Sequence, residues 1–219
     1  MKQRILTSYY KLLGALARRY IQATKPYIIG INGSVGKTSC RTIITQTLQQ
    51  LLPQAIVYTS PKNFNGELGM SLSIFAIETY TPSVIGMLQV LGQAMRATCF
   101  SQISSQSTTI SPKILVLEYG IDHPGEMAFL ISIAKPHISV HTQIDAVHSL
   151  QFGSPEKIAR EEFLLQENTR EIAFVNIDDT YLTSIAPHIT CDRLTYSATH
   201  EKTTTTISRS MNTTENIAP

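Results

Sequence analysis

The first 66 residues contain no aspartate or glutamate, although the chain of 219 residues has 16 acidic and 18 basic residues in all. Nine of the basic residues lie in this acid-free stretch, which therefore carries a charge of +9, while the remaining 153 residues sum to −7. Such a split indicates an anionic partner near the N-terminal third, either a phosphate group, a membrane surface or a nucleic acid. Charge alone does not distinguish among these partners, whereas sequence motifs do.

Cysteine is also scarce, since the chain has three cysteines that are far apart and form no CxxC pair (Cys40, Cys99 and Cys191). We therefore expect no zinc site and no disulfide framework, and a reducing cytosol is the favoured compartment. All three are expected to be small buried hydrophobic residues.

Long apolar runs are missing near the N-terminus, where basic residues interrupt each one, so we expect neither a signal peptide nor a membrane span of ~20 apolar residues. With 42% hydrophobic and 16% charged residues, the chain can build the core of about one domain. This composition excludes a disordered tail, a collagen-like repeat and a supercharged nucleic-acid scaffold.

Apolar residues at 4–22 recur at helical spacing, with basic residues elsewhere on the helix. Two interpretations remain open: a helix packed on the domain that follows, or a basic amphipathic helix on an anionic membrane surface.

From residue 26 onward, short apolar runs alternate with helical patterns. Strands are expected at 27–31, 55–58, 113–120, 137–142, 172–176 and 191–196, and helices at 37–52, 67–78, 83–97, 124–135, 155–167 and 179–186. This alternation predicts an α/β fold, a mainly parallel sheet with helices on both faces. We expect three parts: a basic helical segment (1–25), the α/β domain (26–196) and a polar tail or truncated continuation (197–219), with 101–112 as a surface loop.

The sequence INGSVGKTSCRTII lies between a buried strand and a helix, where a glycine-rich turn can surround phosphate oxygens with backbone N–H groups. It is tighter than the strict GxxxxGK[ST] pattern, because only GxxGKTS is present from Gly33 to Ser39. Lys37 is expected at the β- and γ-phosphates and the Thr38 hydroxyl on Mg²⁺. Glu118 ends the strand KILVLE and is the candidate metal-binding carboxylate, whereas Arg41 is expected to be a solvated charge.

Five blocks in order resemble the ATP-dependent Mur ligases, and among them most closely the D-alanyl-D-alanine-adding members. They are NGSVGKTS, SPKNFNGELGMSLSIF, LVLEYGIDHPGEM, DAVHSLQFGSPEKIAREE and FVNIDD, and the resemblance extends from about Tyr27 to Tyr196. It implies the central, ATP-binding domain of a cytoplasmic ligase of peptidoglycan precursor synthesis. Such a ligase activates a carboxylate as an acyl phosphate and joins it to the amino group of an amino acid or dipeptide.

The resemblance also implies roles for individual residues, with ATP and Mg²⁺ as cofactors. It places ATP at Gly33, Ser34, Val35, Gly36, Lys37, Thr38, Ser39 and Asn176, with Asp178 and Asp179 near the adenine. Metal ions are implied at Thr38, Glu118 and His148, and the reacting end of the substrate at Asn63, Asn65 and His123. The other histidines that match no block (His137, His141, His188 and His200) are expected at the surface or at strand ends. No nucleic-acid partner is expected, and membrane contact remains a hypothesis for residues 1–25.

Three departures from the family pattern stand out. Glu162 takes the place of a lysine that becomes carbamylated in the family and helps to hold the second metal, so a built-in carboxylate predicts activity without bicarbonate. Gln143 replaces an asparagine before the histidine loop. Domains that would hold the UDP-sugar and close over ATP are not found in these 219 residues.

These departures leave a second function open, a non-catalytic ATP-dependent binding or regulatory module. Turnover that depends on both a carboxylate and an amine would distinguish a ligase from such a module. A GTPase is disfavoured, because the chain has no guanine-specifying NKxD motif, and the later blocks argue against a kinase as well.

Overall fold

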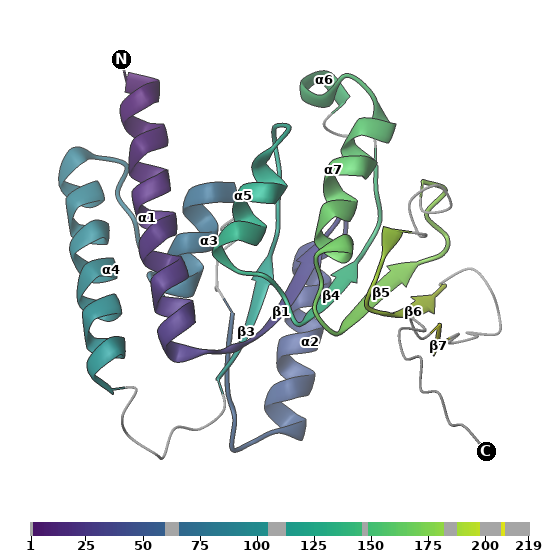
Figure 1. Cartoon of the computed structure of the whole chain (residues 1–219), viewed down its shortest axis with the longest axis horizontal. Coiled ribbons are helices and arrows are strands. Elements are labelled where there is room, and N and C mark those ends of the chain that lie inside the picture. The colour runs from purple at the N-terminus through teal and green to yellow at the C-terminus, as the bar shows by residue number, and fades with distance from the viewer. Residues whose placement is uncertain are drawn as a thin grey trace, which may run out of the picture.

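A computed structural model describes residues 2–59, 66–104, 113–145, 149–181, 188–197 and 207–208. Within these residues it contains a seven-stranded sheet in the order β2-β3-β1-β4-β5-β6-β7 (Figure 1). The strands are β1 (Tyr27–Asn32), β2 (Ile56–Thr59), β3 (Lys113–Glu118), β4 (Ile138–His141), β5 (Ile172–Asn176), β6 (Asp192–Tyr196) and β7 (Ile207–Ser208). The first six are parallel, and β7 pairs antiparallel with β6. The predicted α/β fold is confirmed.

The continuous apolar run of β1 buries side chains on both faces of the sheet. Ile29 and Ile31 pack against α2 (Lys37–Leu51), where Ile44 and Leu48 cover them. Ile28 points to the opposite face and joins the main core. Side chains of a strand alternate between faces, so one strand of this composition needs helices on both sides.

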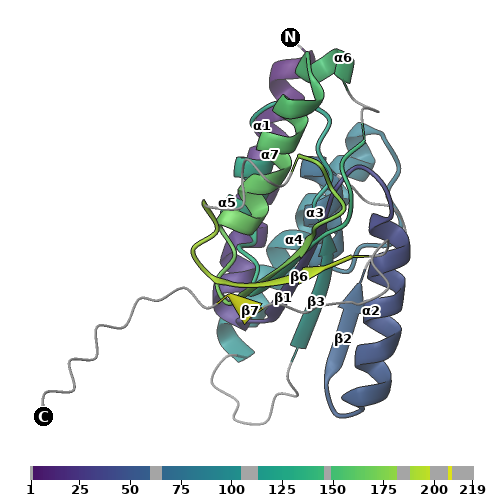
Figure 2. The ribbon, with the colours of Figure 1, turned by 90° about the vertical axis from the view of Figure 1, so that its right-hand side faces the viewer.

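The second face is covered by α3 (Gly66–Ile74), α5 (Glu126–Ile133) and α7 (Pro155–Glu167). Above them lies α1 (Lys2–Thr24), which contacts α3 and α5 and buries Leu13 and Ala17 completely. Outermost is α4 (Val84–Ser104), which packs on α1 (Figures 1 and 2). A short helix, α6 (Ser149–Phe152), precedes α7. The expected N-terminal helix is thus confirmed, and it packs on the domain.

Helix α3 ends at Ile74, four residues before the predicted end at residue 78. Ala76 has a left-handed backbone with φ 55°. Around it, the N–H of Ile77 donates to the Leu72 carbonyl and that of Ala76 to the Ser73 carbonyl. This is the hydrogen-bond pattern of a Schellman C-cap, which usually requires glycine. Without a glycine, the sequence carried no sign of the stop.

Several other predicted boundaries differ from the structure. Helix α4 continues to Ser104, into the segment 101–112 predicted as a loop, and the rest of that segment lies outside the described residues. Residues 179–181 form a turn instead of the predicted helix, whose other residues are not described. The short pairing of β7 with β6 in the polar tail was not predicted.

The prediction of three buried cysteines is wrong. Cys99 is exposed on α4, and Cys40 and Cys191 are half-buried. Cys99 faces outward because α4 packs along only one of its sides. The apolar pattern around Cys99 is too irregular to predict which side of the helix it occupies. Among the described residues, no helix combines the length and the apolar character needed to cross a bilayer.

Candidate functional site

The phosphate loop lies between β1 and α2, where the strand order changes direction because β3 and β4 flank β1 on opposite sides. In open parallel sheets ligands bind at such switch points, at the carboxyl ends of the strands. Two glycines shape the loop with positive φ values, Gly33 at 121° and Gly36 at 87°. A Cβ atom at Gly33 would lie 2.3 Å from the Thr142 hydroxyl oxygen, so the close approach of the two segments also requires glycine.

Backbone N–H groups of the loop divide into two sets. Those of Ser34 and Val35 donate to the Gln143 carbonyl, which ties the loop to the segment after β4. At the start of α2, the first helical bond runs from Cys40 to the Gly36 carbonyl, and no side chain caps this end. The N–H groups of the first helical turn therefore have no acceptor within the helix, and a helix end of this kind favours an anion.

Lys37 lies across this loop. Its ammonium group donates to the Gly33 carbonyl and, at 3.2 Å, to the Ser34 carbonyl. The positive charge is thereby held beside the first turn of α2, where the helix dipole also favours negative charge.

Thr38 and Glu118 meet as the sequence predicted, with 3.5 Å between the hydroxyl and Oε2 of the carboxylate. Arg41 does not behave as predicted: it is buried, and its guanidinium forms an ion pair at 3.0 Å with Oε1 of Glu118. Arg41 lies one helical turn after Lys37, so its side chain reaches Glu118 at the end of β3. The sequence alone did not predict this contact. Although Arg41 lies nearby, Oε1 accepts no hydrogen bond within the described part of the chain.

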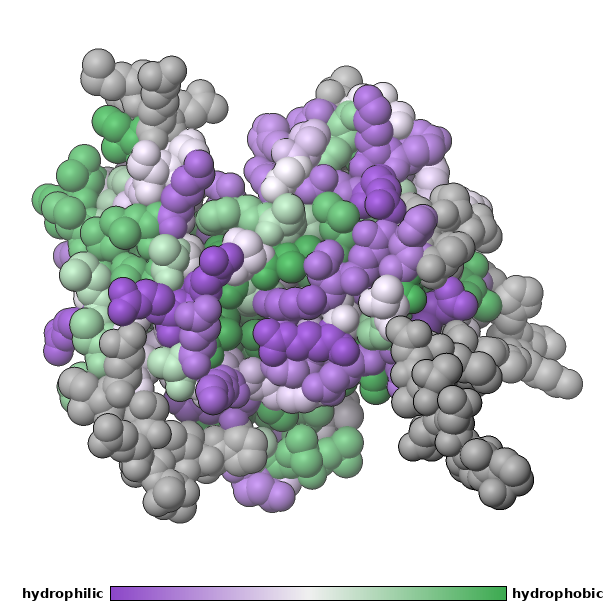
Figure 3. All heavy atoms as spheres, in the orientation of Figure 1, coloured by the Kyte–Doolittle hydropathy of each residue, from purple (hydrophilic) through white to green (hydrophobic). Residues whose placement is uncertain are grey.

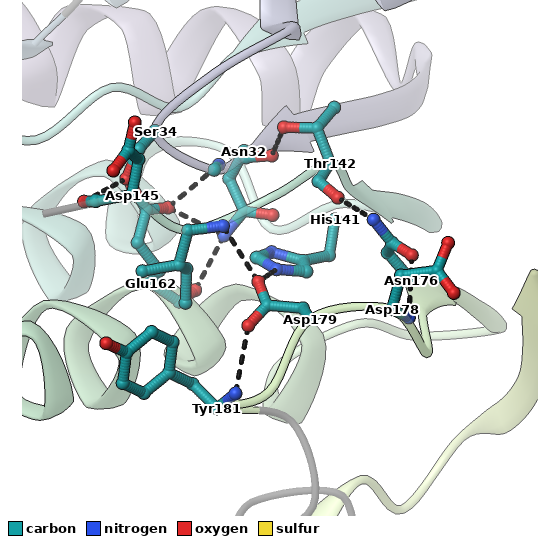
Figure 4. Close-up of polar contacts among 12 residues, drawn as sticks. Asn32, Ser34, His141, Thr142, Asp145, Glu162, Asn176, Asp178, Asp179 and Tyr181 are labelled. Carbon is teal, nitrogen blue, oxygen red and sulfur yellow. Dashed lines mark hydrogen bonds and ion pairs between the residues drawn. The ribbon is translucent and has the colours of Figure 1, made fainter. Parts of the chain in front are cut away.

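Glu162 is buried beneath the loop (Figure 4). Its Oε2 accepts hydrogen bonds from the Asn32 side chain at 2.8 Å and from the Gly33 N–H at 3.1 Å. Gln166, one turn later, donates to Asn32 Oδ1 at 2.7 Å. Burial raises the pKa of Glu162, and the positive charge of Lys37 is the main influence that opposes this rise.

A pocket of ≈ 90 Å³ opens beside the loop, and Lys37 and Glu162 both line it. Asp122 and Gly120 complete the side formed by the turn after β3. The loop, the end of β3 and helix α7 therefore meet at one pocket that contains charges of both signs.

A second buried pair supports the segment after β4. His141 Nε2 lies 3.0 Å from Oδ2 of Asp179, and both side chains are almost inaccessible (Figure 4). Burial opposes ionisation of Asp179, but hydrogen bonds from His141 and from the N–H groups of Ile144 and Tyr181 outweigh it and lower its pKa. Asp179 thus holds the chain that leads from β4 toward residue 148.

Asn176 ends β5 and is nearly buried. Its amide nitrogen donates to the Thr142 carbonyl at 2.8 Å, and its oxygen accepts from the Asp178 N–H at 3.0 Å. Asn176 and Asp178 therefore lie on the same edge of the sheet as the loop.

The remaining predictions for the metal ions and for the substrate concern His123, Asn63, Asn65 and His148. His123 is exposed in the turn after β3, 3.3 Å from Glu126, whose carboxylate also accepts from the Asp122 N–H. Asn63, Asn65 and His148 lie outside the described residues, as does His200. The part of the chain that is described contains no cluster of three or more His, Cys, Asp or Glu side chains suited to a metal ion.

Sequence reasoning missed three contributors to the site: Asn32, Gln166 and the Arg41–Glu118 pair. Asn32 could have been suspected, because it is a polar residue at the end of a buried strand. For His141, the expected strand-end position is confirmed, although its complete burial was not predicted.

Comparisons with known proteins agree with this arrangement. The family model described as the Mur ligase middle domain matches residues 31–217. The UDP-N-acetylmuramoyl-tripeptide--D-alanyl-D-alanine ligase of Mycobacterium leprae is 29% identical over 184 residues, which cover 83% of this chain and 29% of that ligase. The corresponding ligase of Bacillus subtilis is 27% identical over 159 residues, or 73% of this chain and 27% of that protein. This chain thus spans less than a third of either relative.

Among solved structures, the chain resembles a MurF ligase from Thermotoga maritima in complex with ADP, with a TM-score of 0.62 and 24% identity. The match covers 87% of this chain and 37% of that structure. A MurF structure from Acinetobacter baumannii gives a TM-score of 0.61 at 20% identity. At these identities the structural matches show a shared fold.

Proposed function

Because the chain belongs to the Mur ligase family through its middle domain, we propose that it is the ATP- and Mg²⁺-binding domain of an ATP-dependent amide ligase. One observation carries the proposal: Lys37, Thr38 and Glu118 meet at a phosphate loop on the switch point of a parallel sheet. Its relatives are named for a UDP-N-acetylmuramoyl-tripeptide and for D-alanyl-D-alanine. We propose substrates of these classes here, in the synthesis of a peptidoglycan precursor in the cytoplasm.

In this proposal ATP lies with its phosphates on the loop from Gly33 to Ser39, where backbone N–H groups and Lys37 balance the negative charge. A substrate carboxylate attacks the γ-phosphate, so that ADP leaves and an acyl phosphate forms. The amino group of the second substrate then attacks the acyl carbon, phosphate leaves, and an amide bond remains.

Thr38 and Glu118 are suited to Mg²⁺, because a hydroxyl and a carboxylate are oxygen ligands and Oε2 of Glu118 lies 3.5 Å from the Thr38 hydroxyl. When bound, Mg²⁺ supplies positive charge to the phosphoryl oxygens. The chain itself orients these two oxygens, since Arg41 fixes the Glu118 carboxylate and α2 fixes the Thr38 hydroxyl.

The finer assignments extend the same proposal. In this proposal His148 would hold a second Mg²⁺, and Asn176 would lie at the adenine. The reacting end of the substrate would face Asn63, Asn65 and His123. Glu162 is proposed as the carboxylate that takes the place of a carbamylated lysine. Its position in the pocket beside Lys37 supports this role. In this proposal the domain comprises residues 26–196, and the helical segment 1–25 packs on it.

Nucleotide turnover tests the proposal. ATP binding and ADP release are measured for the natural chain, for Lys37→Ala and for the matched control Lys157→Ala, which removes an exposed lysine of α7. Loss of the ammonium group should weaken ATP binding by about tenfold to a hundredfold, because hydrogen bonds from charged groups contribute about 1.5–3 kcal/mol. Unchanged ATP affinity in Lys37→Ala would contradict the site.

A non-catalytic ATP-binding module is the second candidate, favoured by Glu162 at the position where the family carries a lysine. ADP release that requires both a UDP-muramoyl peptide and D-alanyl-D-alanine supports the ligase. ATP binding that neither substrate influences supports the module.

A further inference from the structure

The two outermost helices, α1 and α4, contain no acidic residue. Together they hold six of the chain's basic residues: Lys2, Arg4, Lys11, Arg18, Arg19 and Arg96. The phosphate loop uses none of them, because Lys37 and Arg41 belong to α2. The N-terminal excess of positive charge therefore divides into a phosphate site and a separate helical layer.

Helix α4 exposes large apolar side chains along its free side. The exposed fractions are 74% for Val84, 70% for Ile85, 63% for Leu88, 52% for Met95 and 75% for Phe100. Residues 84, 88 and 95 follow helical spacing and share one side of α4. A helix whose outer side carries such residues and only one charge is unusual at a water-exposed surface.

Helix α1 continues this surface. It exposes Ile5 and Leu12, and it also exposes the cations Lys11 and Arg19. The helices lie side by side and run in the same direction, because the Tyr9 hydroxyl donates to Met87 and the Thr98 hydroxyl donates to Leu16. Figure 3 shows the result on the side where α1 and α4 lie: hydrophobic areas with hydrophilic side chains among them.

A groove of ≈ 160 Å³ runs between α1 and α5, and both Lys11 and Arg18 line it. Arg18 is held there, because its Nε donates to the Ser132 carbonyl at 2.5 Å. The groove thus offers two cations beside an apolar wall that includes Phe129. Glu67 of α3 is half-buried, and burial raises its pKa although the charge of Lys11 acts to lower it.

We propose that the outer layer of α1 and α4 docks on the surface of an anionic lipid bilayer. Basic residues of α1 contact lipid phosphates, with Lys11 and Arg18 offering a place for a headgroup, while Val84, Leu88 and Met95 of α4 enter the headgroup region. Charge of a single sign interleaved with exposed apolar side chains fits such a surface. A nucleic acid would match the charge but leave the apolar side chains in water. This inference is independent of the proposed ligase activity.

Co-sedimentation of the whole chain with lipid vesicles tests the inference. The natural chain should bind vesicles of phosphatidylglycerol, bind phosphatidylcholine vesicles much more weakly, and lose affinity as salt is added. The double substitution Lys11→Gln/Arg19→Gln should weaken binding by about tenfold or more, since each cation near an anionic membrane contributes on the order of fivefold. Val84→Ser/Leu88→Ser should also weaken binding by at least about tenfold.

Two matched controls alter other surfaces. Ile43→Ser removes an exposed apolar side chain of α2, and Lys157→Gln removes an exposed cation of α7. Neither should change vesicle binding. Equal losses in the controls, or no binding to phosphatidylglycerol, would overturn the inference. So would a dimer that Val84→Ser/Leu88→Ser dissociates in the absence of vesicle binding, because the apolar side would then face a second protein.

Discussion

Two features of Glu162 have opposite effects on the ionisation of its carboxyl group. The carboxyl group is buried, which opposes ionisation, and it accepts hydrogen bonds from Asn32 and Gly33, which favour it. Hydrogen bonds stabilise the carboxylate, but burial is the larger effect and raises its pKa above the ordinary value of 4.5. The folded chain therefore retains a proton at Glu162 at pH values where the unfolded chain has lost it. Folding stability consequently decreases as the pH rises from 4.5 through the folded-state pKa.

We predict that Glu162→Gln removes this pH dependence. An amide oxygen can accept the bonds from Asn32 and Gly33 but does not ionise. The free energy of unfolding of the variant, relative to the natural chain, should therefore increase as the pH rises from 4.5. Urea unfolding at a series of pH values measures the difference. A difference that stays constant with pH, or one that Glu161→Gln reproduces, would count against this account.

At the scale of elements, the packing of α3 depends on where this helix ends, and its sequence contains no glycine that would indicate that end. Ala76 adopts φ 55° so that the chain can leave the helix and bury Ile77 at once. A left-handed backbone brings the alanine Cβ too close to a neighbouring carbonyl oxygen, and glycine has no such contact.

We predict that Ala76→Gly stabilises the chain by about 0.5–1 kcal/mol, because relief of this strain exceeds the extra backbone entropy of glycine. Ala76 is exposed, so no packing is lost. Ala15→Gly is the matched control: it is exposed in the middle of α1 and should destabilise by about 1 kcal/mol. Chemical denaturation measures both, and equal effects of the two substitutions would exclude the strain.

Local sequence patterns predicted most of these helices and strands, but they did not predict which of them contact one another. Helix α7 has its predicted bounds because Ser154 caps it, with its side chain accepting the Lys157 N–H, and Pro155 begins it. Strand β5 likewise matches, because its apolar run is bounded by polar residues. By contrast, the contact of α7 with the phosphate loop joins Glu162 to Gly33 across 129 residues, and no local pattern encodes it.

At the scale of the whole molecule, the proposed phosphate site joins β1, β3 and α2 at the centre of the sheet. A ligand bound there contacts elements that must all be folded, so its binding energy adds to the stability of the complete domain. The outer layer of α1 and α4 is separate from this site, and its basic residues are different from those at the site.

We predict that Mg²⁺–ATP at a hundredfold excess over its Kd increases the free energy of unfolding by about 2.7 kcal/mol. For a chain of this size the midpoint of thermal unfolding should rise by roughly 5–10 °C. Lys37→Ala should lose most of this increase at the same ATP concentration, whereas Val84→Ser/Leu88→Ser should keep it. Differential scanning calorimetry with and without the nucleotide measures the shift, and equal shifts in Lys37→Ala and the natural chain would place ATP elsewhere.

By itself, the sequence determined the alternation of strands and helices, the glycine-rich loop and the family, because periodicity, glycine placement and short motifs act over a few neighbouring residues. Only the tertiary structure decided that Arg41 pairs with Glu118, that Glu162 lies under the loop and that α4 leaves an apolar side uncovered. Each of these depends on which segments meet after the chain crosses from strand to strand. The acid-free N-terminal third thus contains the proposed phosphate site and a basic outer helix, which the fold separates by placing α2 and α1 on opposite faces of the sheet.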